Sequence, residues 1–217
     1  MKRPRGFSLI ELLVALSVLL VTSALAFFIF ELGSRWFRTL ITQQGLESQL
    51  RRFSATARRD LELTNYQGVT SVTARSLSVL GQSRARHALC LPGVSNWSAA
   101  SAYDPASGLP NWDRYLLYYA NLDESGRVIR CLIDPPGGVF AAGPLTGFQN
   151  NPGGYLLDDP HLIPEHESHR EVARDVLEFS VQLDGSQTIV LDLKLRLEQE
   201  LRELRLEVIA RNTFPLL

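Results

Sequence analysis

The chain has 217 residues, of which 45% are hydrophobic and 21% charged, and its formal net charge is −1. A general nucleic-acid binder is expected to be basic overall, and a disordered chain combines low hydrophobicity with high net charge, so the composition argues against both classes. The apolar residues are unevenly placed, because the N-terminal stretch is almost purely hydrocarbon. The remainder has a soluble composition and is long enough to bury a core.

The N-terminal stretch starts with the cations Lys2, Arg3 and Arg5 and continues over residues 7–30 as an apolar run whose only charge is Glu11. About 24 residues at ~1.5 Å each make roughly 36 Å of helix, enough to cross the ~30 Å core of a bilayer. We therefore predict a transmembrane helix over residues 7–30. The cations are expected to hold its N-terminus on the cytoplasmic side.

An ordinary secretory signal peptide is the rival interpretation of this segment. Residues 12–21 would be its apolar region, and Ala24-Leu25-Ala26 is an A-x-A cleavage pattern. Two features count against it: the apolar run continues past Ala26 to Phe30, and Glu11 lies inside the run. A charge at mid-membrane depth costs roughly 2.5–3.5 kcal/mol on insertion scales, which is unexpected in a segment that is discarded.

The eleven residues from Gly6 to Leu16, GFSLIELLVAL, closely resemble the prepilin signature of type IV pilins and type II secretion pseudopilins. In that family a membrane aspartyl peptidase cuts after the glycine and N-methylates the new first residue. The resemblance thus implies cleavage between Gly6 and Phe7, methylation of Phe7, and loss of residues 1–6 as a basic leader peptide. It also implies other pilins, the prepilin peptidase and an inner-membrane assembly platform as partners. The resemblance is strongest over residues 1–35.

Glu11 has a role that follows from this resemblance. Cleavage creates an ammonium group on Phe7, at the start of a helix buried in lipid or in a fibre core. The Glu11 carboxylate of a neighbouring subunit could pair with it, which would offset two desolvated charges and set the axial register during assembly. The alternative is an isolated acid that reaches the membrane interface.

An amphipathic helix is predicted to continue over residues 31–67, where only Gly33 and Gly45 weaken the helical pattern. We interpret its basic residues as a face of the helix exposed to solvent. The alternative is a stripe of positive charge that binds nucleic acid, but the composition of the chain makes direct nucleic-acid binding unexpected. The predicted apolar face recurs at three- and four-residue steps and consists of Leu32, Trp36, Leu40, Leu46, Leu50, Phe53, Ala57 and Leu61.

Residues 68–217 are predicted to form an antiparallel β-sheet domain with long loops, because the hydrophobic period shifts to two after Gly68. We expect loops over residues 92–111 and 134–164, a hairpin turn at 123–126, and turns at Asp184-Gly185 and over 198–202. A sheet with one apolar face needs a cover, which the amphipathic helix supplies, so the predicted fold is α+β and pilin-like. The predicted strands cover residues 76–80, 87–91, 115–122, 127–133, 177–183, 189–197 and 204–210.

Catalytic signatures such as G-x-S-x-G, a Walker loop or H-E-x-x-H do not occur in the chain, so no enzyme activity and no cofactor are expected. Cys90 and Cys131 lack zinc-site spacing. If this part is exported they could form a disulfide, and the alternative is two separate buried thiols.

Two polar clusters and a group of aromatic residues are candidates for binding. Five His and Glu residues fall within nine positions: His161, Glu165, His166, Glu167 and His169. His166 and His169 with Glu165 could hold a divalent metal, but mixed His/Glu surfaces are common, and no metal site is predicted. Asp158-Asp159 with Asn150-Asn151 could suggest calcium but lacks EF-hand spacing. Core and loop-anchor roles are expected for the aromatic residues Trp97, Trp112, Tyr115, Tyr118 and Tyr119.

The expected function is structural: a minor pilin that primes or caps a type IV pilus used for adhesion, twitching motility or DNA uptake. The long Arg-rich helix resembles that of PilW-type minor pilins and, close behind, of J-type minor pseudopilins of type II secretion. A secretion role is therefore the nearest alternative. A secreted or signal-anchored binding domain or enzyme cut after Ala26 is an alternative of another class. The expected location is the bacterial inner membrane, as a single-pass protein with its globular domain outside the cytoplasm, and then a surface pilus or periplasmic pseudopilus.

Overall fold

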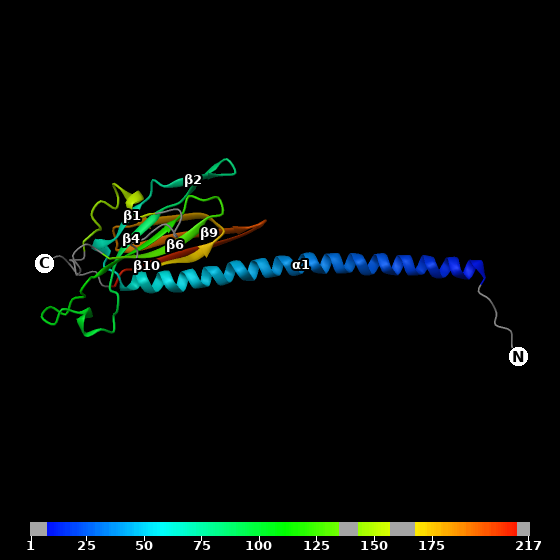
Figure 1. The fold of residues 1–217 in the computed structure, drawn as a ribbon, viewed down its shortest axis with the longest axis horizontal. Helices are drawn as coiled ribbons and strands as arrows, with labels where there is room; N and C mark the ends of the chain where they lie inside the picture. Colours follow the sequence, from blue (N-terminus) through cyan, green and yellow to red (C-terminus); the bar gives the residue numbers. More distant parts are fainter. Residues whose placement is uncertain (1–7, 135–142, 157–167, 212–217) are drawn as a thin grey trace. The chain divides into compact units, whose positions relative to one another are not determined.

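The computed structural model describes residues 8–134, 143–156 and 168–211, which form one long helix and ten strands within those ranges (Figure 1). The chain divides into two compact units, residues 1–44 and 45–217. The first unit holds the N-terminal part of helix α1 (Leu9–Leu63), and the second holds the rest of α1 and all the strands. The fold is α+β and pilin-like, as the sequence predicts.

Helix α1 is continuous over 55 residues, since neither Gly33 nor Gly45 interrupts it (Figure 1). It ends at Leu63, four residues before the predicted end. Asn65 begins a separate 3-10 helix (Tyr66–Gly68), in which its side chain accepts a hydrogen bond from the backbone N–H of Gln67 at 2.9 Å. Burial of the apolar face starts at Leu46. Leu32, Trp36 and Leu40, which belong to the predicted apolar face, are exposed.

The larger sheet has the strand order β1-β4-β5-β6-β7 and is antiparallel throughout. Its central strand is buried on both faces from Tyr115 to Ala120. One face carries Leu116 and Tyr118, which pack in the same core as Phe53 of the helix, while the other carries Leu117 and Tyr119 in a second core. The bounds are β1 Thr70–Val72, β4 Ala88–Gly93, β5 Arg114–Ala120, β6 Arg127–Ile133 and β7 Ser168–Arg174.

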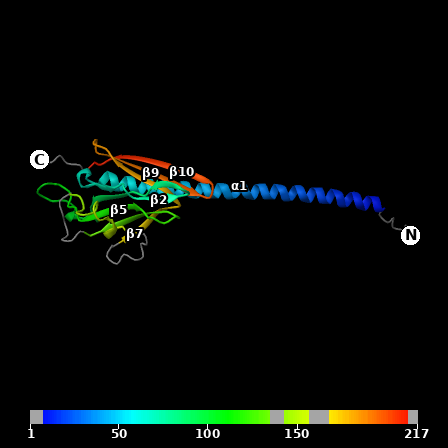
Figure 2. The same cartoon turned by 90° about the horizontal axis from the view of Figure 1, so that it is seen from above.

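A second sheet of three strands, in the order β10-β9-β8, covers the other side of the helix core (Figure 2). It consists of β8 (Val176–Leu183), β9 (Thr188–Leu197) and β10 (Glu200–Ile209). Phe53 joins the layers, because its ring makes edge-to-face contacts with Tyr118 of β5 and Phe179 of β8, at centroid distances of 6.3 and 6.1 Å. Such pairs add about 0.5–1.5 kcal/mol to the stabilisation from burial.

The single predicted sheet is thus two packed sheets plus a separate hairpin of β2 (Ser76–Val79) and β3 (Gln82–Ala85). The chain leaves the larger sheet between β7 and β8 at Asp175, which has a φ of 56° in the left-handed region. The predicted turn over residues 198–202 is also wrong. Glu198, with a φ of 56°, makes a tighter turn, and β10 already pairs with β9 from Glu200 onward. The predicted strands lacked β1, β3 and β7.

The outer face of the three-stranded sheet carries charges of alternating sign in neighbouring strands. Lys194 of β9 lies 3.3 Å from Glu178 of β8 and 3.8 Å from Glu203 of β10. One step along, Arg205 of β10 lies 3.9 Å from Asp192 of β9. Surface pairs of this kind contribute roughly 0–1 kcal/mol each to stability.

Candidate functional site

The first turn of α1 is closed by two reciprocal hydrogen bonds between Ser8 and Glu11. The backbone N–H of Ser8 donates to Oε2 of Glu11 at 2.9 Å, and the backbone N–H of Glu11 donates to Oγ of Ser8 at 3.2 Å. This is a capping box, whose sequence signature S-x-x-E is present at residues 8–11 but was not recognised in the sequence. The carboxylate therefore points toward the start of the helix, where the helix dipole favours a negative charge.

The side chains that follow form an exposed apolar surface around α1. By length and composition, α1 is the one described helix that could cross a membrane, with a mean hydropathy of 2.7 in its most apolar window and none of that window buried. Its hydroxyl groups bond within the helix: Ser17 donates to the Leu13 carbonyl at 2.8 Å and Thr22 to the Val18 carbonyl at 2.9 Å. Both hydroxyl groups therefore have a hydrogen-bond acceptor within the helix, which they need in lipid, where water is absent.

Charged residues bracket this apolar surface. After Glu11 the next charge is Glu31, which forms an ion pair with Arg35 one turn on. The twenty or so residues between the two acids span roughly 30 Å of helix, which matches the thickness of a hydrocarbon core. The segment thus suits a membrane crossing with one capped carboxylate near its start.

The predicted processing residues lie outside the described part of the chain. Lys2, Arg3, Arg5, Gly6 and Phe7 all belong to residues 1–7. The cleavage site and the leader charges therefore stay predictions from sequence, and Ser8 is the first residue that the structure describes.

Cys90 and Cys131 are both free and buried, so the structure contradicts the disulfide and favours two separate thiols. Cys90 pairs with Leu117 across β4–β5, and Leu117 pairs with Cys131 across β5–β6. The two cysteines are therefore two strands apart, roughly 10 Å, whereas a disulfide needs Cα atoms within about 7 Å.

Neither thiol should react with a maleimide at pH 8 until the protein unfolds. Burial raises the pKa of Cys131 to about 11 and that of Cys90 further, so the reactive thiolate is scarce in the folded state. Labelling is expected to be at least about a hundredfold slower than in urea, since each pKa unit reduces the thiolate tenfold. The matched control is Ser168→Cys, at an exposed position, which should label at once. Fast native labelling of the unaltered chain would contradict the structure.

The other candidate residues do not form a site in the described ranges. His161, Glu165, His166 and Asp158-Asp159 lie outside them, while His169 is exposed on β7. Within the described ranges no group of three His, Cys, Asp or Glu side chains is placed to hold a metal. Tyr115, Tyr118 and Tyr119 are core residues, and Trp97 packs edge-on against buried Trp112, as expected for core and loop-anchor roles.

Comparison with known proteins gives one match. Residues 1–27 match the family model described as the prokaryotic N-terminal methylation motif. No curated protein and no solved structure matches the chain significantly. The match covers the capped start of α1 and most of its apolar surface, and it supports a protein of the type IV pilin or pseudopilin type.

Proposed function

We propose that the protein is a minor structural subunit that is cut between Gly6 and Phe7 and joins a fibre through α1. The observation that carries the proposal is the match of residues 1–27 to the methylation motif, together with the Glu11 carboxylate turned toward the helix start. The exposed apolar surface that follows would lie in lipid before assembly and against the helices of other subunits afterwards.

The machine we favour is a type IV pilus, with a role in priming or capping the fibre. A globular part of more than 150 residues with a long loop between β4 and β5 suits a terminal position better than a bulk subunit. Adhesion, twitching motility or DNA uptake would then be the activity of the assembled pilus. A minor pseudopilin of type II secretion is the second candidate, because the same N-terminal motif serves both machines.

The proposed topology places the N-terminus in the cytoplasm and residues 45–217 outside it, anchored in the inner membrane until assembly. It follows from the excess of cations in residues 1–6 and from the positive-inside tendency. The processing enzyme would be a prepilin peptidase, and assembly would require an inner-membrane platform and other pilins.

The mature N-terminus separates this proposal from a secreted domain cut after Ala26. Mass spectrometry and N-terminal sequencing of the protein purified from its native cells should give methylated Phe7 as the first residue. Gly6→Val should leave the leader attached, because a branched side chain replaces the glycine that the peptidase recognises. Ala24→Leu, which destroys the A-x-A pattern, should be processed as before. A mature chain that starts at Phe27 would refute the proposal.

A further inference from the structure

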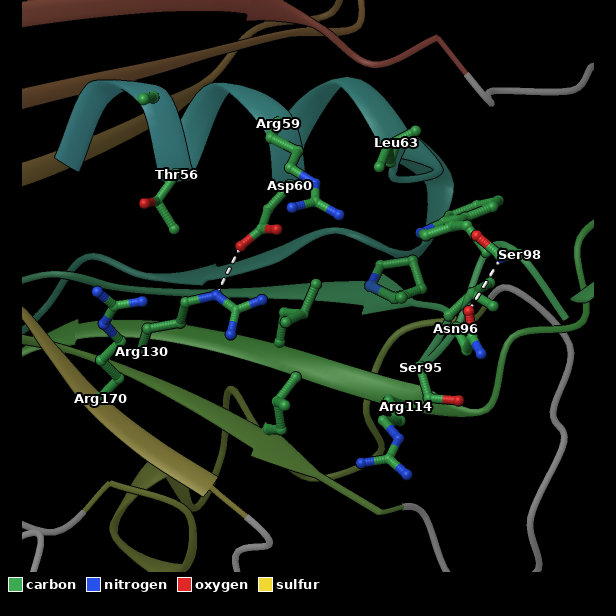
Figure 3. Close-up of a pocket in the computed structure, with 17 residues that line it drawn as sticks. Thr56, Arg59, Asp60, Leu63, Ser95, Asn96, Ser98, Arg114, Arg130 and Arg170 are labelled. Atoms are coloured by element: carbon green, nitrogen blue, oxygen red, sulfur yellow. Dashed lines mark hydrogen bonds and ion pairs between the residues drawn. The ribbon is translucent and has the colours of Figure 1, made fainter. Parts of the chain in front are cut away.

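An arginine-rich pocket lies at the C-terminal end of α1, between the helix, the larger sheet and the loop that follows β4. Its volume is about 630 Å³, within the roughly 300–1,000 Å³ typical of small-molecule sites. Arg59 reaches it from α1, Arg114 from β5, Arg130 from β6 and Arg170 from β7. Figure 3 shows Arg59 on the helix side of the pocket, with Arg130 and Arg170 on the strands opposite.

Positive charge exceeds negative charge in this pocket. Asp60 is the single acid among the lining residues, and its Oδ2 accepts hydrogen bonds from Arg130 Nε at 2.7 Å and Tyr118 Oη at 2.5 Å. Arg114 lies 3.7 Å from Asp134, a weaker ion pair at the margin. Asp113 is bound to Ser95 through both carboxylate oxygens.

Arg59 and Arg170 have no ion pair or hydrogen bond with any described residue. Arg170 stands directly opposite Arg130 in the β6–β7 register, and like charges in that position destabilise a strand pair. Both side chains nevertheless line the pocket on the side opposite the helix, and Arg59 adds a third positive charge from the helix side (Figure 3). An anion held between these groups would remove the repulsion.

We propose that this pocket binds a small ligand that carries at least one oxyanion group. A guanidinium group offers a planar fork of donors that matches phosphate, sulfate and carboxylate oxygens, often in bidentate pairs. Arg59 and Arg170 would hold one oxyanion group of the ligand beside Arg130. The side chain of Trp97 also lines the pocket and supplies an aromatic surface for the remainder of the ligand.

The proposal concerns residues 45–217 alone and is independent of how the N-terminus is processed. A bulky polyanion such as duplex nucleic acid is a poor fit, because the pocket is the size of a small molecule and the chain is not basic overall. The pocket itself carries a net positive charge although the whole chain does not, and this local charge favours a small anionic ligand.

Calorimetric titration of the full-length protein in an uncharged maltoside detergent tests the proposal. Pyrophosphate and citrate are the two probes, each compared with sodium chloride at equal ionic strength, and they distinguish a phosphate from a carboxylate ligand. Saturable binding of either probe is expected, and the intrinsic tryptophan fluorescence should change with the same midpoint, because Trp97 lines the pocket. Absence of saturable binding for both probes would overturn the proposal.

Matched variants locate the binding. Arg59→Gln and Arg170→Gln should each weaken binding at least about tenfold, as expected for loss of a charged hydrogen bond. Both side chains are exposed, so thermal unfolding should be unchanged. Arg58→Gln, next to Arg59 on the helix but outside the pocket, should bind as the unaltered protein does. Equal weakening in Arg58→Gln would show non-specific screening and refute the site.

Discussion

Replacement of Glu11 by leucine should abolish incorporation of the subunit into the fibre and leave membrane insertion and cleavage intact. Leucine lowers the cost of insertion, because it removes a charge from an apolar segment. The cut lies outside the turn that Glu11 closes, between residues 6 and 7. What is lost is the carboxylate that would pair with the ammonium group of Phe7 on another subunit. The measurement is the amount of subunit in sheared or purified fibres, with the membrane fraction as reference.

Two further variants separate this charge pair from the capping box. Glu11→Gln retains an oxygen that can accept the Ser8 N–H bond but carries no charge, so assembly should still fail. Glu47→Leu, which removes an exposed acid from the same helix, should assemble normally. Assembly of Glu11→Leu at the unaltered level would disprove the pairing, and assembly of Glu11→Gln alone would assign Glu11 to capping.

Replacement of Asp60 by alanine should lower the free energy of unfolding by about 3–5 kcal/mol, the cost of breaking a buried ion pair. Asp60 is buried at the inner face of α1 and accepts hydrogen bonds from Arg130 and from the hydroxyl group of Tyr118. Burial raises the pKa of Tyr118, so its hydroxyl group stays protonated and can donate this bond. Without the carboxylate, Arg130 loses its ion pair and still faces Arg170. Urea unfolding of the full-length chain in detergent, followed by tryptophan fluorescence, measures the loss.

The double variant Asp60→Leu/Arg130→Met is the informative control. Apolar replacements of both partners are often neutral or stabilising, so it should regain most of the stability lost in Asp60→Ala. Glu124→Ala, at an exposed acid, should change stability by less than about 0.5 kcal/mol. A loss below 1 kcal/mol in Asp60→Ala would show that the pair does not secure the end of the helix.

Local periodicity was enough to predict α1 and most of the strands, but not the layers into which they pack. Residues 127–133 form β6 at the predicted bounds, because alternation and a clear turn at 123–126 define that hairpin. The sequence pattern did not predict the second sheet. The apolar run of β5 is buried on both faces, and such a run indicates that other elements pack against both faces of its sheet. Such a sign is ambiguous in sequence, since a short apolar run also fits a helix.

The two sites differ in how much the sequence reveals. The N-terminal site is contiguous, so the motif and the S-x-x-E signature can be found without coordinates. The arginine pocket joins arginines that are up to 111 positions apart, from Arg59 to Arg170. It depends on the pairing of β6 with β7, a strand that the sequence pattern did not predict. Only strand register could bring Arg130 and Arg170 together.

The charged outer face of the three-stranded sheet also explains how β9 finds its correct alignment with β10. The inner residues of the two strands are mostly leucine, so a slip by two positions would preserve apolar burial almost unchanged. One slip would set Arg205 against Lys194 and Glu207 against Asp192, and the opposite slip would set Glu203 against Asp192. Like charges would face each other either way. Pairs that contribute little to stability thus select one alignment among several of similar hydrophobic energy.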